Sequence, residues 1–236
     1  MPRVIPFAQR SRTAAALAVV VLMTAAAGAC SSGPPPPAAA SGSYEQELRE
    51  GRRLKDEFFK STPSCGAGRD PSLPCSPLPE ADRQAFTTLS YFEVDAAYRV
   101  PAALAPEQTN PPVTIILPTS QNLPRRMVKV GTLRFTVAGQ TLTLSAFAGE
   151  GEGLARLFVP FGDTTNRQET YGGGRYLDLD LTPTGLYDLD FNRATNPYCV
   201  YNVTYDCPIP PPENRLPIAI RAGERMPSSL PHLLPR

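Results

Sequence analysis

Beyond Leu89, apolar and polar residues alternate in short runs that glycine and proline separate. An alternation with a period of two places the apolar side chains of a strand on one face. Several short strands punctuated by turn residues are typical of antiparallel folds. The pattern therefore predicts a mainly β protein, a single-domain antiparallel sandwich or partly open barrel with one N-terminal helix.

The same alternation places the individual strands. Residues 133–137 alternate, a turn follows at 138–140, and the alternation resumes over 142–146, which predicts a β-hairpin. Further strands are expected over residues 113–117, 155–161, 175–181, 187–191, 200–205 and 216–221.

The N-terminal helix is predicted from capping and periodicity. Ser43 and Gln46 have the spacing of a capping box. The positions that follow at intervals of three and four residues form one helical face: Tyr44, Leu48, Gly51, Leu54 and Phe58. A second helical turn is expected over 79–86, because Pro79 suits a first helical position.

The first 30 residues have the three parts of a bacterial lipoprotein signal. Arg3, Arg10 and Arg12 supply positive charge without any acidic residue, residues 13–29 are apolar or small, and Cys30 follows directly. This arrangement predicts a signal peptide over residues 1–29 and lipidation of Cys30. Acyl chains would then anchor the protein, since each buried methylene contributes about 0.8 kcal/mol.

Two alternatives to lipidation stay open. Ala27 and Ala29 also fit the small-residue rule of the ordinary signal peptidase, which would secrete the protein. An uncleaved anchor is the other alternative, although a run of 17 residues is short for a bilayer core of about 30 Å. The favoured prediction, with Ser31 after the cysteine, is a lipid-anchored protein outside the cytoplasm, in the cell membrane or the outer membrane.

The rest of the chain divides into a linker, a domain and a tail. Residues 30–43 are rich in proline, alanine and serine, which indicates a spacer. Residues 44–226 are long enough for one β-rich domain with its own core. Residues 227–236 are predicted to be a disordered tail.

The composition excludes several classes of enzyme. The one histidine, His232, lies in the proline-rich tail. A Ser-His-Asp triad, a Cys-His pair and a histidine-ligated metal all need an imidazole held in a site. No glycine-rich nucleotide motif follows an expected strand. Without residues 1–29 the chain has 20 basic and 22 acidic side chains, and this net charge of −2 does not favour nucleic acid.

Four cysteines remain once Cys30 carries a lipid. An even number in an oxidising compartment favours disulfides, and four cysteines allow three pairings. We favour the local pairs, Cys65 with Cys75 and Cys199 with Cys207, because short loops close at the lowest entropic cost. Metal binding by the second pair is the alternative, which the lack of histidine partners disfavours.

Four aspartates form a pattern that folding alone does not explain. If the two strands that carry them pair with their apolar residues on one face, Asp180 lies opposite Asp188 and Asp178 lies opposite Asp190. Like charges about 5 Å apart destabilise a sheet, so their repulsion must be offset.

Three arrangements would offset this repulsion, and they imply different functions. Interleaved arginines would make the pattern structural, and the candidates are Arg175, Arg193, Arg215 and Arg221. A calcium ion bound by Asp178 and Asp190 would make it a metal site. Raised carboxylate pKa values would suit acid–base chemistry, as in glycoside hydrolysis.

Dense runs of glycine, aspartate, asparagine and proline give the chain a distinctive set of segments. The most specific is LFVPFGDTTNRQETYGGGRYLDL at 157–179. The others are LKDEFF at 54–59, SPLPEADRQAF at 76–86, YF at 91–92, YRV at 98–100, LDFNRATNPYC at 189–199 and CPIPPPENRLPIAIRAGE at 207–224. With these segments, residues 48–224 resemble the bacterial domain-of-unknown-function family numbered 1684. The resemblance implies a mostly β fold and no particular activity.

The resemblance also sorts the polar residues. Asp178 and Asp190 fall within its motif, whereas Asp180 and Asp188 do not. We predict a ligand-binding face formed by motif residues: Asp163, Arg175, Asp178, Asp190, Asn192 and Arg215. Asn196, Glu213 and Asn214 belong to the same motif. The alternative is a hydrogen-bond network that fastens loops to the edge of the fold.

The favoured functional hypothesis is an envelope lipoprotein that contacts the membrane through its lipid and binds a small ligand, a cation or an envelope component. It is not expected to be an enzyme. One alternative is a carboxylate-based hydrolase, with its acid and base among Asp163, Glu169, Asp178 and Asp190. The other is a structural or partner-binding lipoprotein, which a large exposed apolar patch would indicate.

Overall fold

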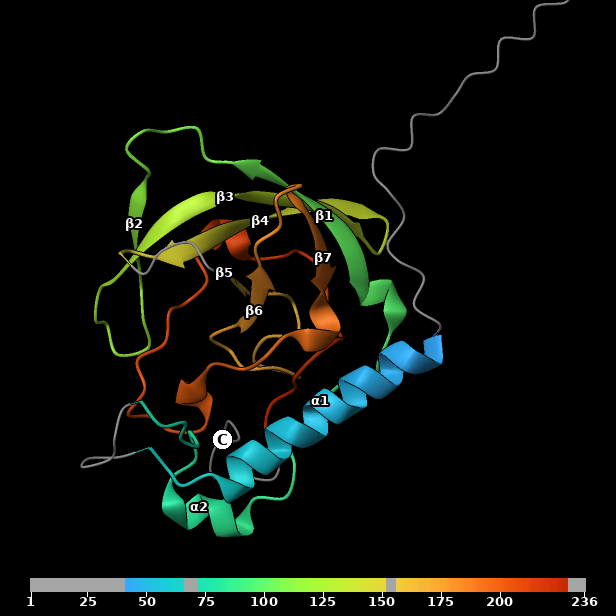
Figure 1. Cartoon of the computed structure of the whole chain (residues 1–236), viewed down its shortest axis with the longest axis vertical. Coiled ribbons are helices and arrows are strands. Elements are labelled where there is room, and N and C mark those ends of the chain that lie inside the picture. Colours follow the sequence, from blue (N-terminus) through green and yellow to red (C-terminus); the bar gives the residue numbers. More distant parts are fainter. Residues whose placement is uncertain (1–40, 66–71, 152–155, 229–236) are drawn as a thin grey trace, which may run out of the picture. The chain divides into compact units, whose positions relative to one another are not determined.

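The computed structural model describes residues 41–65, 72–151 and 156–228 (Figure 1). The predicted signal peptide, Cys30 and His232 lie outside the described residues. Within the described ranges, no helix combines the length and the apolar character that a membrane span requires. The elements are α1 (Ser41–Ser61), α2 (Glu80–Ala85), β1 (Arg99–Pro106), β2 (Thr114–Leu117), β3 (Arg125–Val137), β4 (Gln140–Gly149), β5 (Arg156–Phe161), β6 (Arg175–Asp180) and β7 (Leu186–Asp190). One-turn 3-10 helices lie at Ala96–Tyr98, Phe191–Arg193, Tyr198–Val200 and Pro212–Asn214.

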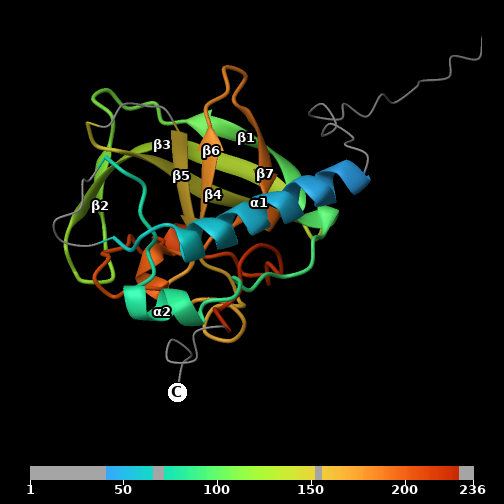
Figure 2. The ribbon, with the colours of Figure 1, turned by 60° about the horizontal axis from the view of Figure 1, so that its bottom comes forward.

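The strands form one seven-stranded antiparallel sheet. Its order is β6-β5-β4-β3-β1-β7, and β2 pairs with the first residues of β3. The sheet curls until its edge strands β6 and β7 line one pocket, so it is nearly closed into a barrel (Figures 1 and 2). The predicted fold class, mainly β with an N-terminal helix, is confirmed.

The predicted hairpin is the β3–β4 pair. Val137 pairs directly with Gln140, so the turn consists of Ala138 and Gly139 alone. Both turn residues have positive φ, 49° and 73°, which matches the twist of antiparallel strands. The second predicted helical turn is also present, as α2, one residue shorter at each end.

Three apolar clusters form the core of the described residues, and the smallest consists of Leu117, Met127 and Phe147. The inward side chains of the barrel include Leu133, Phe135, Val137, Leu144, Leu157, Val159, Phe161, Leu177 and Leu189. The second cluster lies where the two helices meet the segment after β7, and it consists of Phe59, Leu78, Phe86, Leu89, Val200 and Tyr201. This second cluster attaches the helices to the barrel.

Helix α1 presents a different face to the barrel than the one we predicted. It begins at Ser41, so Ser43 lies inside its first turn rather than before it. Leu54, placed on the apolar face by its spacing, is 51% exposed. Tyr44, Leu48 and Phe59 are the buried apolar residues of the helix. The face that they define also contains Arg52 and Lys55. The helix lies across the sheet on the side of β6 and β7 (Figure 2).

Three strand assignments need correction. Strand β1 was not expected, because Pro101 and Pro106 disfavour a strand. Pro106 is the last residue of its pairing with β3, and Pro101 precedes that pairing and lies opposite Asp188 of β7. The segments 200–205 and 216–221, predicted as strands, join no sheet. In the second of these, the Ile220 backbone binds buried side chains instead of a neighbouring strand.

Candidate functional site

The predicted β6–β7 hairpin does not form. β6 pairs with β5 and β7 pairs with β1, so these two consecutive strands occupy opposite edges of the sheet. The aspartates that we expected to oppose each other therefore do not pair across a ladder. All four instead line a pocket of about 270 Å³ between the two edges: Asp178, Asp180, Asp188 and Asp190.

Arginines neutralise most of this acidic pocket. The ion pairs are Arg99–Asp188 at 2.6 Å, Arg156–Asp180 at 3.1 Å and Arg193–Asp190 at 3.2 Å. Of the arginines predicted for this role, only Arg193 has it. Partial burial raises the pKa of Asp178, which lies opposite Phe158. In the described part of the chain, no group of three or more acidic, histidine or cysteine residues is arranged to hold a metal ion, so the geometry gives the calcium hypothesis no support.

Arg175 lies inside the protein and not on a ligand-binding face. Its side chain is fully buried, and its Nη2 donates to Asp163 Oδ2 at 2.9 Å, within an ion pair that is 0% exposed. Burial lowers the pKa of Arg175, and the Asp163 carboxylate opposes that shift. Arginine stays protonated even so. We assign this pair a structural role, because neither side chain reaches solvent and both are bonded within the domain.

The Arg175 guanidinium binds the end of the domain. It donates to the carbonyls of Ile220 at 2.7 Å, Glu224 at 3.2 Å and Ala222. Asp163 accepts from the Ile220 N–H at 3.3 Å in return. One ion pair therefore satisfies several backbone groups of a segment that belongs to no strand.

Asp190 and Asn192 connect β7 to α1. The Tyr44 hydroxyl donates to both carboxylate oxygens of Asp190 at 2.8 Å, and the Asn192 side chain donates to that hydroxyl at 3.1 Å. Burial and the nearby Asp190 carboxylate raise the pKa of Tyr44, so the phenol stays protonated as a donor. Both predicted residues thus serve to position the helix.

Arg215 is exposed, and the buried polar residue beside it is Asn214. Asn214 accepts from the Ser145 N–H at 2.7 Å and donates to the carbonyls of Ser145 and Pro160 at 2.9 and 2.7 Å. The six residues predicted to form a single face are therefore distributed over the interior, the β6–β7 gap and the surface.

A pocket beneath α1 brings together charged groups from distant parts of the chain. Its volume is about 190 Å³, and it is lined by Leu48, Gly51, Arg52, Lys55, Tyr91, Asn192, Arg193, Ala194, Thr195 and Glu224. Three of these side chains are basic and one is acidic. The lining is therefore net positive.

Arg52 is the basic group of this pocket with unused hydrogen-bonding capacity. Its Nη1 donates to the Phe92 carbonyl at 3.1 Å, and its guanidinium stacks over the Tyr91 ring at 4.4 Å. Its Nε and Nη2 are buried without a hydrogen-bond partner. Burial lowers the pKa of Arg52, which signals a charge held away from water.

Glu224 is the carboxylate at the base of this pocket. It is fully buried and accepts from Lys55 Nζ at 2.5 Å, the Asn196 N–H at 2.7 Å and the Tyr201 hydroxyl at 3.1 Å. Burial first, and then the Glu224 charge, raise the pKa values of Tyr91 and Tyr201. The phenols remain neutral donors, and Glu224 has its own cation in Lys55.

One of the two predicted disulfides is present. Cys65 and Cys75 are bonded, with their Cα atoms 4.9 Å apart. Cys199 and Cys207 are free thiols, contrary to the prediction. The Cys207 Sγ accepts from the Cys199 backbone N–H at 3.1 Å, so the two residues are in contact without a bond between their sulfurs.

The comparisons with known proteins agree with this architecture. A family model described as a protein of unknown function, DUF1684, matches residues 84–225. The chain belongs to the DUF1684 family. An uncharacterized protein from Haloarcula marismortui, whose structure was determined by solution NMR, is 38% identical, with a TM-score of 0.58 over 78% of this chain and 95% of that one. Among curated proteins there is no match.

The DUF1684 match contains part of the pocket beneath α1 and leaves the helix itself outside. Tyr91, Asn192 and Glu224 lie within the matched residues, whereas Arg52 and Lys55 precede them. Sequence reasoning missed both basic residues. The signal was their spacing, because they follow Leu48 at the intervals of four and seven residues that define one helical face.

Proposed function

We propose that this DUF1684 protein is a lipid-anchored, extracytoplasmic binding protein that takes a small anion in the pocket beneath α1. The observation that carries the proposal is the Arg52 guanidinium, which has two buried nitrogen atoms without a partner. A buried donor without an acceptor costs about 1–3 kcal/mol, and an anionic ligand would remove that cost.

The geometry of the guanidinium favours an oxyanion. Two N–H groups of one arginine are oriented to meet two oxygens of a carboxylate or a phosphate, and such bonds are among the strongest in proteins. Arg52 is held in place by the Phe92 carbonyl and the Tyr91 ring, so little freedom is lost on binding. Lys55, on the same helix, also lines the pocket and neutralises Glu224, so the Arg52 charge remains for a ligand.

The volume limits the ligand to a small molecule. A water molecule occupies about 30 Å³ in the liquid, so a pocket of about 190 Å³ has room for about six. This is below the range of about 300–1,000 Å³ for sites that take drug-sized ligands. Inorganic phosphate, sulfate and short carboxylic acids fall within that limit.

Binding is favoured over hydrolysis by the state of the carboxylates. Asp163 is paired with Arg175 inside the protein, and Glu169 is paired with Arg221 at 2.9 Å. Asp190 accepts from Tyr44, Asn192 and Arg193. A general acid and base must reach a shared substrate. Asp178 shares a pocket with Asp190, but Asp190 is held by these three donors, and Asp163 and Glu169 are engaged elsewhere.

The binding proposal is tested with phosphate, sulfate and succinate as probes. We expect at least one to raise the melting temperature and to bind in calorimetry, with about 2.7 kcal/mol of stabilisation at a hundred times its Kd. Arg52→Ala should weaken binding about tenfold or more, since a hydrogen bond to a charged group contributes about 1.5–3 kcal/mol. Sodium chloride at equal ionic strength controls for screening.

The matched control is Arg53→Ala. Arg53 is the next residue of the same helix, is exposed, and pairs with Glu50 and Glu57 at 2.7 and 3.0 Å. Its loss should leave the affinity unchanged. The proposal fails if none of the three anions binds, or if Arg52→Ala binds as tightly as the wild type.

The anchor has its own test. Replacing Cys30 with alanine is expected to move the protein from the membrane fraction to the soluble fraction, because the lipid would have no attachment point. Ser31→Ala should leave the fractionation unchanged. Continued sedimentation of the Cys30→Ala protein with membranes would instead point to an uncleaved helix or another anchor.

A further inference from the structure

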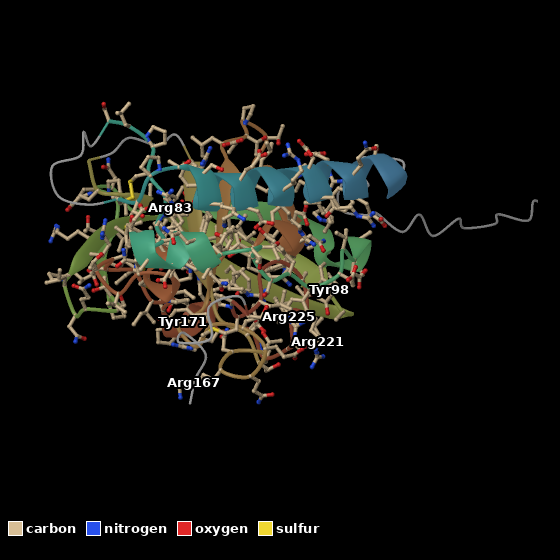
Figure 3. The ribbon with its side chains drawn as sticks, turned by 90° about the horizontal axis from the view of Figure 1, so that it is seen from below. Arg83, Tyr98, Arg167, Tyr171, Arg221 and Arg225 are labelled. Carbon is tan, nitrogen blue, oxygen red and sulfur yellow. A yellow bond between two sulfur atoms is a disulfide. The ribbon has the colours of Figure 1, made fainter. Side chains whose placement is uncertain are left out.

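Cys199 and Cys207 form a pair of thiols with unequal surroundings. Cys199 is half-buried at the one-turn helix Tyr198–Val200, whereas Cys207 is buried. The Cys199 N–H donates to Cys207 Sγ at 3.1 Å, which places the two residues in direct contact across their loop. The Tyr171 hydroxyl, whose residue is labelled in Figure 3, lies 4.0 Å from Cys199 Sγ.

The contacts divide the pair into a reactive and a protected thiol. A hydrogen bond with Cys207 is the main cause that lowers the pKa of Cys199 to about 7, and Ser120 and Tyr171 act in the same direction. The same hydrogen bond and burial raise the pKa of Cys207. At neutral pH Cys199, the less buried of the two residues, is therefore the one that carries thiolate, the nucleophilic form of cysteine.

The surface around Cys199 is suited to contact with another molecule. Val203, between the two cysteines, is 79% exposed, and Tyr198 is 39% exposed. These exposures show that the segment between the two cysteines is open to solvent, so a small reagent can approach it. Cys65 and Cys75, in contrast, already form a disulfide.

We propose that Cys199 and Cys207 form a thiol–disulfide exchange site, with Cys199 as the attacking thiol and Cys207 as the resolving thiol. The substrate is the disulfide of a small thiol such as glutathione. This activity is independent of the anion pocket, because neither cysteine lines that pocket.

The exchange runs in two balanced steps. The Cys199 thiolate attacks one sulfur of the substrate disulfide, a mixed disulfide forms, and the other substrate sulfur leaves as a thiolate. Cys207 then loses its proton to solvent and attacks the Cys199 sulfur, which releases the second substrate thiolate. The substrate disulfide gains two electrons, and the Cys199–Cys207 pair gives up the same two electrons as it becomes a disulfide.

Glutathione disulfide is the probe for this site in the full-length protein, with each cysteine followed by peptide mass mapping. In Cys207→Ser we expect one glutathione to accumulate on Cys199, because the resolving thiol is absent. The wild type should instead reach the Cys199–Cys207 disulfide without a lasting adduct. Cys199→Ser should react at least tenfold more slowly, and the Cys65–Cys75 bridge serves as an internal reference.

A second measurement uses the wild-type protein, so its result does not depend on whether a variant folds. Alkylation of reduced wild-type protein by iodoacetamide should label Cys199 before Cys207, with a rate that rises with pH around a midpoint near 7. Two outcomes overturn the proposal. One is a Cys199–Cys207 bridge that reduced glutathione leaves intact under native conditions, and the other is a pair of thiols that glutathione disulfide leaves unmodified.

Discussion

Replacing Arg175 with methionine is expected to lower the free energy of unfolding by about 3–5 kcal/mol, the cost of leaving one buried charge without its partner. Methionine keeps an unbranched apolar side chain but is shorter than arginine, so the change removes the charge and its hydrogen bonds and also leaves some space where the guanidinium lay. The variant loses the Asp163 ion pair and the donors to three backbone carbonyls. Each carbonyl that stays buried without a donor adds to the loss.

Urea denaturation followed by far-UV circular dichroism measures this effect, since the chain has no tryptophan for fluorescence. The matched control is Arg221→Ala, which removes an exposed pair with Glu169 and should cost no more than about 1 kcal/mol. In the double variant Asp163→Asn with Arg175→Met, part of the lost stability should return, because the isolated charge is gone. Equal losses for Arg175→Met and Arg221→Ala would contradict a structural role for the buried pair.

Replacing Phe59 with alanine should also be strongly destabilising, by about 3–5 kcal/mol. Phe59 is fully buried in the second core cluster, with its ring centroid 5.0 Å from that of Tyr201 and 5.9 Å from that of Phe86. Alanine would leave a cavity where the two helices attach to the barrel. The lost contacts and that cavity both raise the cost.

Leu54→Ala is the control on the same helix. Leu54 is half exposed, so its loss should change the free energy of unfolding by only about 0.5 kcal/mol. The comparison, again by urea denaturation, tests whether α1 belongs to the folded domain. Similar small effects for both substitutions would show that the helix does not share the cooperative core.

Local features of the fold could be predicted from the sequence, and features that depend on distant pairing could not. The β3–β4 hairpin was predictable because its turn residues, Ala138 and Gly139, are adjacent to the strands they join. Strand β1 was not, because its prolines disfavour strand and only its neighbours β3 and β7 make it one. Residues 216–221 were predicted as a strand and form none, because their backbone binds the buried side chains of Asp163 and Arg175, which are distant in the sequence.

The candidate site shows the same division. The motif indicated Arg175, Asp190 and Asn192 as important, and each makes buried polar contacts, yet nothing local places them in different parts of the fold. Their separation follows from β6 and β7 pairing with β5 and β1 instead of with each other. Arg52 was missed because an arginine on an otherwise apolar helical face does not fit a simple pattern of apolar positions.

The contacts of Arg175 also set an order on the assembly of the domain during synthesis. Its acceptors at Ile220, Ala222 and Glu224 are among the last described residues of the chain, about 45–50 positions after the arginine itself. Arg175 is the first residue of β6. Until residues 220–224 emerge, its guanidinium lacks the carbonyl acceptors that allow it to be buried. The end of the barrel around Arg175 would therefore stay incompletely folded during synthesis until residues 220–224 have emerged.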